Sequence, residues 1–497
     1  MNKRLLTTLV MFLMALVFTL MALVFTGCEL DQRYNPSENM TDSSGVSEAD
    51  ITRFEKGYRF DKNGWIYIHI EGEPFERGRQ HGYLVAKELK DINRSLEYLT
   101  MQDTGMEWSY FVQSAEAMFV PMMDAEMLDE IKGIAAGAQE AGTDITWQAI
   151  LAWNGYEEMT DYWWPNEQQR VYGTLPTQID HDHCSAFIAV GDATSDGKPV
   201  IAHNSWNNFE WGQFANEVID IVPTNGHRIV MQTQPAYIHS AADFFVTDAG
   251  LAGTETTIGG FDVYAAGEAP EFYRIRMAMQ YANDFDSFVN YMRANNNGGY
   301  ANTWLIADTS TNEIMQFEQG LKFDNVQKKT DGFFVGFNAP QDPRIRNLET
   351  TNSGYMDLRR HQGARQVRLT ELMEKHYGNI DVEIGKEVLA DHYDVYLDRS
   401  DNPSSRTIDG HYELDSREYM SQPGRPIPFQ PRGTVDGKII NGTMAADLSF
   451  IARWGNSSGM PFDASDFLDE HIQYRYLDGY LKDRPKQPWT LFSPDEL

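Results

Sequence analysis

The stretch that decides the fold reads His181-Asp-His-Cys-Ser-Ala-Phe-Ile-Ala-Val190 and continues, after a turn, as Pro199-Val-Ile-Ala-His-Asn-Ser-Trp206. Residues 185–190 and 200–203 have the length and apolar composition of short buried strands. Residues 191–198 join them and contain Asp196-Gly197, a dipeptide typical of hairpin turns. The sequence therefore predicts a β-hairpin that returns His203 towards Cys184.

Cys184 is one of two cysteines in the chain, and the other, Cys28, ends an N-terminal apolar segment. A thiol with a nearby histidine is the minimal set for a thiolate nucleophile, because the imidazole accepts the thiol proton. The plainer interpretation is a small buried apolar side chain. Cys184 has no partner for an internal disulfide, and a free thiol in an oxidising compartment is at risk of oxidation. Its retention there favours a chemical role.

Residues 1–27 carry Lys3 and Arg4, then an apolar run, and are predicted to be an export signal. Thr26-Gly27 before Cys28 resembles a bacterial lipoprotein box and predicts lipidation at Cys28; an uncleaved membrane anchor is the alternative. Residues 28–50 are rich in Ser, Asn, Asp and Glu and are expected to form a flexible tether. The sequence thus predicts an exported, membrane-anchored bacterial lipoprotein, periplasmic or on the cell surface.

Net charge excludes one class of partner. The formal charge is 41 − 73 = −32, and removal of the two lysine and arginine charges in the signal gives about −34. Nucleic-acid binding needs clustered positive charge, so we expect none. The triplet His181-Asp182-His183 raises metal binding, but consecutive strand residues point to alternate sides and rarely form a compact ligand set. We therefore predict no metal and no cofactor.

The upstream chain alternates strand and helix signals. Residues 65–70 predict a strand, and Gly78 and Gly82 lie one helical turn apart, so another backbone can approach that face. Residues 122–140 and 146–154 predict helices, the second with Asp144 as a plausible N-cap. Residues 157–182, aromatic and polar with little periodicity, are expected to form a loop.

Downstream, the strand signals lie at residues 215–222, 227–232, 244–248, 250–257, 300–308 and 313–318, with helical spacing at 271–282, 286–294, 355–377 and 380–393. Residues 400–431 are expected to form a long surface loop, and residues 445–454 a strand. This order predicts an α+β architecture in which helices cover a stack of mainly antiparallel sheets.

Several segments in this order carry a family resemblance. His183-Cys-Ser-Ala-Phe187, Ala202-His-Asn-Ser-Trp206, Glu255-Thr-Thr-Ile258 and Tyr300-Ala-Asn-Thr-Trp304 resemble the phospholipase B-like (lamina ancestor) proteins. The segment from Phe75 to Gly82 and the one from Glu130 to Ala138 resemble the related penicillin acyltransferase type of cysteine amidohydrolase. The resemblance implies an N-terminal-nucleophile hydrolase, a four-layer αββα sandwich, and self-cleavage between His183 and Cys184. Residues 51–183 and 184–497 would then form one globular domain.

The resemblance also implies roles for particular residues. Cys184 would be the nucleophile, with its freed α-amino group as base; His203 would tune the thiol, and Asn302 would donate to the oxyanion. Substrate-binding positions would be Trp206 as a pocket wall, Thr256 or Thr257, and Arg276, whose role the family does not define here. His183 stands where the animal proteins usually have a small residue, a departure from the family pattern at the expected cleavage position.

Two function classes stay open. The first is an acyl hydrolase or acyltransferase that forms a thioester at Cys184 and acts on an amide of a fatty or aromatic acid, or on a phospholipid ester. The second is a non-catalytic surface lipoprotein that uses the same fold to bind a ligand. The sequence contains no motif that recognises the leaving group, and it does not indicate an oligomeric state.

Overall fold

The computed structural model describes residues 48–173, 184–240, 242–261, 263–351, 354–416 and 427–494. The predicted export signal, Cys28, nearly all of the predicted tether and His183 lie outside the described residues. Within these ranges, no helix is both long and apolar enough to cross a membrane.

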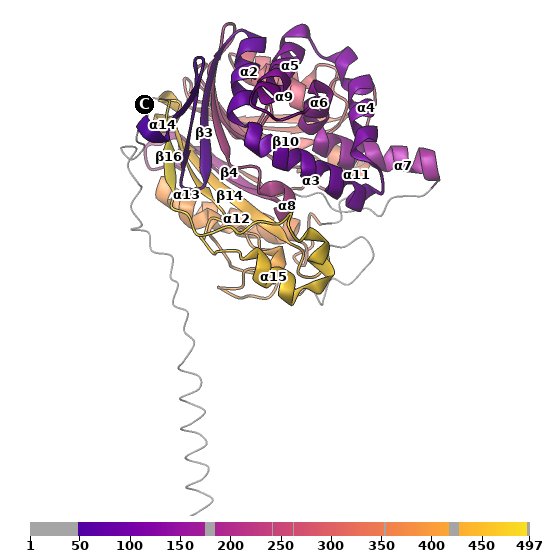
Figure 1. Ribbon diagram of the computed structural model, residues 1–497. Coiled ribbons are helices and arrows are strands. Elements are labelled where there is room, and N and C mark those ends of the chain that lie inside the picture. Colours follow the sequence, from indigo (N-terminus) through magenta and orange to yellow (C-terminus); the bar gives the residue numbers. More distant parts are fainter. Residues whose placement is uncertain are drawn as a thin grey trace, which may run out of the picture. The chain divides into compact units, whose positions relative to one another are not determined.

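Two β-sheets form the centre of the molecule (Figure 1). The larger sheet has the order β1-β2-β3-β6-β7-β8-β9-β10-β11-β12, and β3 with β6 is its one parallel pair among the described strands. Its strands are Thr52–Phe54, Gly57–Lys62, Trp65–Gly72, Glu217–Pro223, Ile229–Thr233, Phe245–Thr247, Leu251–Thr257, Asn302–Asp308, Glu313–Gln319 and Asp324–Lys329.

The smaller sheet is antiparallel throughout its described pairs and has the order β13-β4-β5-β14-β15-β16. Its strands are Gly332–Gly336, Cys184–Gly191, Gly197–Asn208, Arg432–Asn441, Phe450–Trp454 and Thr490–Phe492. Cys184 is therefore the first residue of β4, an interior strand of this sheet.

Helices cover the outer face of each sheet (Figure 1). The larger sheet packs against α2 to α6, α9 and α10, which are Pro74–Leu84, Ala86–Thr104, Trp108–Phe119, Ala125–Glu140, Trp147–Asn154, Glu271–Tyr281 and Phe285–Arg293. The smaller sheet packs against α12, His361–Lys375, and α13, Val382–Leu389. The other α-helices of the described chain are α7 Trp164–Tyr172, α8 Phe209–Gly212, α11 Pro343–Leu348, α14 Gly442–Ala446 and α15 Ala464–Glu470.

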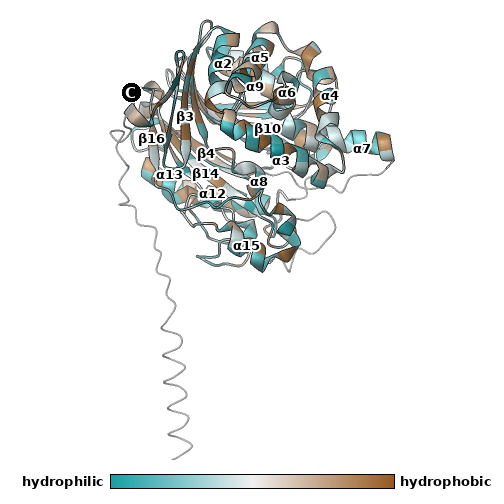
Figure 2. Ribbon diagram, in the orientation of Figure 1, coloured by the Kyte–Doolittle hydropathy of each residue, from teal (hydrophilic) through white to brown (hydrophobic). Residues whose placement is uncertain are grey.

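Three buried layers hold this arrangement together. One lies between the helices and the larger sheet, one between the sheets, and one between the smaller sheet and α12 and α13. Side chains alternate along β4, so Ile188 enters the layer between the sheets and Phe187 the outer one. Figure 2 shows hydrophobic and hydrophilic colours side by side on the helices, as expected of helices that bury one face against a sheet. The predicted four-layer αββα sandwich is confirmed.

The glycine pattern near the N-terminus sets a close helix pair. A Cβ atom on Gly78 would lie 2.1 Å from the Glu130 carbonyl oxygen, and one on Gly82 would lie 1.9 Å from that of Ile134. On the facing helix, a Cβ atom on Gly137 would lie 2.0 Å from the Arg79 oxygen. No real Cβ tolerates such distances, so the α2–α5 contact requires glycine on both helices, as the sequence predicts.

The expected loop at residues 157–182 is wrong over its described part. A π-helical turn, Glu158–Trp163, runs directly into α7. Tyr162, Trp163 and Trp164 are buried, but α7 beyond them is polar and mostly exposed, with only Glu167 also buried, so the apolar residues do not recur at helical spacing. A smaller error concerns α6: its cap is Thr146, whose hydroxyl accepts from the Ala149 N–H at 3.2 Å, rather than Asp144.

The expected surface loop at residues 400–431 is also wrong in its first half. Residues 404–412 are buried, including Arg406, which pairs with Asp394 and with Asp415. The polar composition predicted an exposed loop, but these side chains form hydrogen bonds and ion pairs with one another inside the fold. The strands β12, β13 and β14 were also not predicted. Of these, β14 lies between β5 and β15 in the smaller sheet.

Candidate active site

The predicted hairpin is present and positions His203 near Cys184. Cys184 pairs with Ser205 and Ala186 pairs with His203, so the Cys184 and His203 side chains lie on the same face. The Cys184 thiol is 2% exposed, and its Sγ atom lies 3.6 Å from Oε1 of Glu255 on β9. Sγ, a ring nitrogen of His203 and a Glu255 carboxylate oxygen all lie within 4.8 Å of one another. We call these three residues the nucleophile cluster.

Burial dominates the electrostatics of the cluster. It raises the pKa of the Cys184 thiol well above the ordinary value, and the Glu255 carboxylate raises it further. Burial, followed by the Lys438 ammonium, lowers the pKa of His203 well below its ordinary value. The uncut chain therefore holds a neutral thiol beside a neutral imidazole at neutral pH. A neutral imidazole can accept the proton that the thiol must lose.

Glu255 is the member of the nucleophile cluster to which the sequence assigned no role. Burial and the nearby Glu157 raise its pKa to about 8. The Tyr300 hydroxyl donates to it at 3.2 Å and the Thr257 hydroxyl at 3.4 Å. A signal was present in the sequence, since an ionisable residue in the middle of a buried strand breaks the usual pattern and needs a reason.

The same contacts separate Thr256 from Thr257. The Thr257 hydroxyl bonds Glu255, whereas Thr256 lies against Gly336 of the opposite sheet, where an added Cβ would lie 2.5 Å from its methyl group. Asn302 lies directly opposite Thr257 on β10 and is 1% exposed. Within the described chain, neither its amide nitrogen nor its amide oxygen has a hydrogen-bond partner.

Two residues that the sequence analysis did not single out hold the backbone of Cys184. The Cys184 N–H donates to Oδ1 of Asn338 at 3.2 Å, and the Arg365 guanidinium donates to the Cys184 carbonyl oxygen. Arg365 also donates to Asn338 Oδ1 at 2.7 Å. Asn338 follows β13 and Arg365 lies on α12, so no local pattern connects them with Cys184.

Trp206 does not face the thiol. Its side chain lies on the face of β5 that packs against α12, where the Arg365 guanidinium carbon is 4.0 Å from the ring centroid. Because Ser205 is the residue opposite Cys184, Trp206 points to the other side of the sheet. The contacts therefore do not support a pocket wall at Trp206, although its backbone N–H bonds the Cys184 sulfur.

Arg276 belongs to a different buried group. Its two terminal nitrogens donate to the two carboxylate oxygens of Glu130 at 3.1 and 3.0 Å, and one also donates to the Ile238 carbonyl at 2.6 Å. Arg77 donates to the same carboxylate at 2.7 Å. We call Arg77, Glu130 and Arg276 the ion cluster. It joins α2, α5 and α9, so the contacts of Arg276 are structural and do not support substrate binding.

An aromatic cleft lies close to the nucleophile cluster. It has a volume of about 450 Å³, and its aromatic lining consists of Trp153, Tyr156, Trp164, Trp211, Tyr237, Tyr474 and Tyr476. A smaller cavity of about 20 Å³ shares Glu157 and Tyr237 with the cleft and is also lined by Tyr300, which bonds Glu255. The cleft therefore approaches Cys184 through Glu157 and Tyr300.

Carboxylates predominate among the charged residues of the cleft, which are Asp103, Glu157, Asp161, Glu210 and Arg432. Burial raises the pKa of Glu210 to about 8, and Asp103 contributes to that rise. Burial and Asp161 raise the pKa of Asp103 to about 6. Burial is the first cause of both rises, so an anionic group entering the cleft would be disfavoured by the same loss of hydration and by the nearby Glu157 and Asp161 carboxylates.

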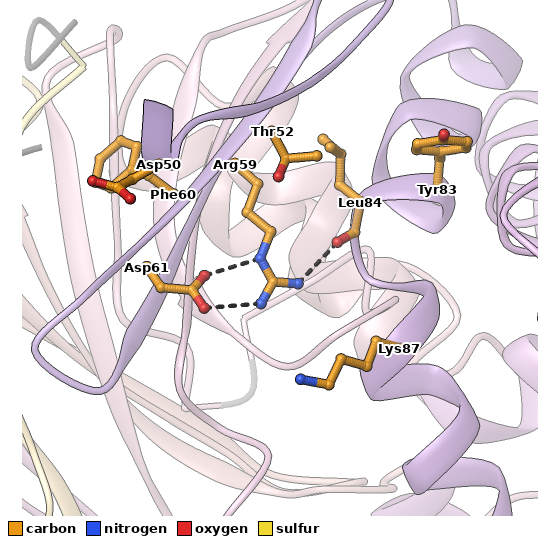
Figure 3. A pocket seen from close by; sticks show the side chains of 8 residues that line it. All are labelled: Asp50, Thr52, Arg59, Phe60, Asp61, Tyr83, Leu84 and Lys87. Atoms are coloured by element: carbon orange, nitrogen blue, oxygen red, sulfur yellow. Dashed lines mark hydrogen bonds and ion pairs between the residues drawn. The ribbon is translucent and has the colours of Figure 1, made fainter. Parts of the chain in front are cut away.

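Another pocket, shown in Figure 3, is formed by β2 and the α2–α3 corner. The Arg59 guanidinium crosses it and is already bonded to Asp61, Glu88 and the Leu84 carbonyl oxygen. None of the residues that line this pocket belongs to the nucleophile cluster. It does not add a chemical group to the site.

The nucleophile cluster also has the ligand types of a metal site, because one sulfur, one nitrogen and one oxygen lie within 4.8 Å of one another. Metal binding would require the thiolate, which burial and the Glu255 charge disfavour. Proton transfer from the thiol to His203 fits the arrangement better.

The family model for phospholipase B matches residues 80–475. The chain belongs to the phospholipase B family. The phospholipase B match includes the nucleophile cluster, Asn302, Asn338 and Arg365, so the residues that converge on Cys184 all lie within the region that defines the family.

Relatives of this phospholipase B family chain occur in distant organisms. An uncharacterised protein of Archaeoglobus fulgidus is 26% identical over 67% of this chain and 59% of its own length. The human "Putative phospholipase B-like 2" and the Crotalus adamanteus "Phospholipase B" are each 24% identical over 55% of this chain and 52% of their own length. The chain thus aligns with about half the length of these curated relatives. A solved penicillin V acylase from Agrobacterium tumefaciens matches at 10% identity with a TM-score of 0.31, covering 55% of this chain and 83% of its own.

Proposed function

We propose that this phospholipase B family chain is an acyl hydrolase that uses the Cys184 thiol as its nucleophile after cutting itself between His183 and Cys184. The observation that carries the proposal is the nucleophile cluster: a cysteine at the start of an interior strand, with an imidazole nitrogen and a carboxylate within 4.8 Å. Family membership supports acyl-bond hydrolysis as the reaction class.

Self-cleavage would begin with attack of the Cys184 sulfur on the carbonyl carbon of His183. His203 accepts the thiol proton and returns it to the Cys184 nitrogen as the C–N bond breaks, which leaves a thioester between residue 183 and the Cys184 sulfur. Water then hydrolyses the thioester, giving a carboxylate on His183 and a free thiol. The Asn338 side chain, 3.2 Å from the Cys184 nitrogen, supports the amine that is released.

Turnover would repeat this chemistry on a substrate. The new α-amino group of Cys184, with an unperturbed pKa of about 8, and the neutral His203 are the available bases for the thiol. The substrate acyl group forms a thioester with Cys184 while the leaving amine or alcohol takes a proton, and water releases the acid. The amide N–H groups of Asn302, which have no hydrogen-bond partner among the described residues, are suited to bind the oxyanion of the tetrahedral intermediate.

The aromatic cleft favours one substrate class over another. Its rings suit a fatty or aromatic acyl group, whereas its carboxylates disfavour an anionic headgroup. We therefore favour an uncharged or cationic N-acyl compound over an anionic phospholipid. A neutral or zwitterionic phospholipid ester remains compatible with the cleft.

The test is the intact mass of the purified chain. Two fragments that meet between His183 and Cys184 are expected; Cys184→Ala should give only uncut chain, and His203→Gln should slow the cut. Ser95→Ala, a small buried hydroxyl on α3, is the control and should be cut normally. An active protein that is uncut throughout would disprove self-activation.

A non-catalytic binding protein is the second candidate. The observation in its favour is the raised pKa of the Cys184 thiol, because an inert buried cysteine would have the same property. An acyl chloromethyl ketone distinguishes the two: labelling of cut protein at Cys184 supports the enzyme, and no labelling of folded, cut protein supports the binding protein.

We also propose that the chain is exported and held at a membrane by a lipid on Cys28. The lipoprotein-like Thr26-Gly27-Cys28 sequence supports this. Cys28→Ser should release the protein from the membrane fraction, and fractionation of cells expressing each form measures it. Equal membrane retention of both forms would instead favour the uncleaved anchor.

A further inference from the structure

A second group of potential ligands lies in the buried segment that follows α13. His392 comes just after that helix, and Asp409 and His411 come just before the short 3₁₀ helix Tyr412–Leu414. The Asp409 side chain is fully buried, and those of His411 and His392 are 2% and 13% exposed. One ligand atom from each residue lies within 4.8 Å of the other two.

Two of the distances in this group match those of a tetrahedral metal site. Oδ2 of Asp409 lies 3.2 Å from Nε2 of His392 and 3.4 Å from Nε2 of His411. Tetrahedral zinc with bonds of about 2.0–2.1 Å places neighbouring ligands about 3.3–3.5 Å apart. The two imidazole rings are nearly perpendicular, at 74°, with centroids 5.0 Å apart.

Hydrogen bonds from outside the group orient His411 and Asp409. The Glu413 carboxylate lies 2.9 Å from Nδ1 of His411, and the Asp401 carboxylate lies 3.9 Å from Nδ1 of His392. Each imidazole therefore presents Nε2 to the centre. Glu413 behind Nδ1 of His411 is the usual support for a metal-bound histidine, whereas the exposed Asp401 contributes only its charge near His392. The backbone N–H groups of Ser457 and Ser458 donate to Asp409 at 3.3 and 3.0 Å.

The charge around this group also suits a divalent cation. Asp401, Asp409 and Glu413 contribute three negative charges next to the imidazoles. The Arg484 guanidinium interacts with Asp409 and Glu413 and offsets one of them. Two negative charges remain if both imidazoles are neutral. A protonated His411 paired with both carboxylates is the competing arrangement.

From this geometry we propose that His392, Asp409 and His411 bind one zinc ion, with water as the fourth ligand. The site would have a structural role. The Ile408 carbonyl, next to Asp409, accepts from the Ser185 hydroxyl at 3.2 Å and from the Asn204 amide at 3.0 Å. Zinc would therefore fasten residues 392–411 against the outer face of β4 and β5, directly behind the nucleophile cluster.

Zinc content and thermal stability of the full chain provide the test. We expect about one zinc per chain by elemental analysis, a lower melting temperature after chelation, and its recovery on adding zinc alone. His392→Gln, at the least buried ligand, should bind zinc at least 100-fold more weakly while folding. His227→Gln, at an exposed histidine paired with Asp248, is the matched control and should retain zinc.

Cobalt separates this site from the nucleophile cluster. Cobalt in the parent chain should give the visible absorption of a tetrahedral ion without a thiolate charge-transfer band, and His392→Cys should add that band. Cys184→Ser should keep the metal. A folded parent chain that binds no zinc at micromolar free metal, or loses it only in Cys184→Ser, would overturn the proposal; the first result would favour the protonated His411.

Discussion

The nucleophile cluster and the ion cluster are both buried groups of polar side chains, yet they differ in how their hydrogen bonds are used. In the ion cluster, both oxygens of Glu130 accept from Arg276, and one also accepts from Arg77. Around Cys184, neither ring nitrogen of His203 and no amide atom of Asn302 has a regular hydrogen bond within the described chain. A buried polar group that makes no hydrogen bond lowers the stability of the fold. A substrate or a reaction intermediate that binds next to it can supply the missing hydrogen bond.

The comparison also separates the pH responses of the two clusters. Burial opposes ionisation of Glu130, but Arg276 and Arg77 outweigh it and lower its pKa. Glu255 has no such cation, and its pKa rises to about 8. The ion cluster should therefore lose stability as pH falls below the ordinary glutamate value. The nucleophile cluster should lose it as pH rises from about 4.3 through 8.

The largest effect on stability is expected when the ion cluster is broken. Glu130→Gln leaves the buried Arg276 without its carboxylate partner and leaves Arg77 only the partly exposed Glu126, and it should lower the free energy of unfolding by about 3–5 kcal/mol. Denaturant unfolding of the uncut Cys184→Ala background measures this without interference from cleavage. Lys132→Ala, which removes an exposed ion pair on the same helix, should change it by about 0.5 kcal/mol or less. If both variants lowered the free energy of unfolding equally, the buried ion cluster would contribute no more to stability than the exposed ion pair.

Asn302→Ala should have the opposite profile, large in kinetics and small in stability. Loss of an oxyanion donor should lower kcat about 100-fold, or about 2.7 kcal/mol, with little change in KM. Its stability should hardly change, because the side chain makes no hydrogen bond in the described chain. Steady-state kinetics on an N-acyl substrate, with unfolding measured in parallel, tests both. An unchanged kcat in folded protein would remove the oxyanion assignment.

Glu255→Gln tests the alkaline response. Folded Glu255 holds its proton up to about pH 8, and the unfolded residue releases it near pH 4.3, so the parent should lose about 2 kcal/mol of stability between pH 6 and pH 8 through this group. Glutamine at residue 255 does not titrate in this pH range, so the plot of unfolding free energy against pH should be flatter for the variant. Glu130→Gln should flatten only the acid side. Identical parent and variant curves above pH 6 would mean that Glu255 is ionised in the folded chain.

The smallest effect distinguishes two adjacent threonines. Thr257→Val removes the hydroxyl that bonds Glu255 and should lower the rate of self-cleavage about tenfold, in line with the loss of one hydrogen bond to a charged or polar partner. Thr256→Val has the same shape change on the neighbouring residue and should alter the rate less than about twofold. Quantifying cut and uncut chain over time after synthesis provides the measurement. A larger effect at Thr256 would reverse the assignment.

The sequence alone determined the features that depend on local pattern. Apolar runs and a turn dipeptide predict the β4–β5 hairpin, and glycines one turn apart predict that another backbone approaches α2 closely, although not that the partner is α5. The order of strand and helix signals predicts layered α+β sheets, the family resemblance implies the αββα sandwich, and both place Cys184, His203 and Asn302 on or next to strands. Each of these conclusions needs only neighbouring residues or their order along the chain.

Only the tertiary structure decided which side chains meet. Glu255 reaches Cys184 from the other sheet, and Asn338 and Arg365 reach it across distant parts of the chain. The register of the hairpin, which shifts between Ala189 and Gly191, turns Trp206 away from the thiol. The sequence suggested substrate binding for Arg276 and a surface loop around Asp409, and neither assignment holds. A charged residue looks the same in the sequence whether it lies at the surface, in a buried ion pair or in a metal site. Burial and partners distinguish these cases, and both arise from contacts between residues far apart in sequence.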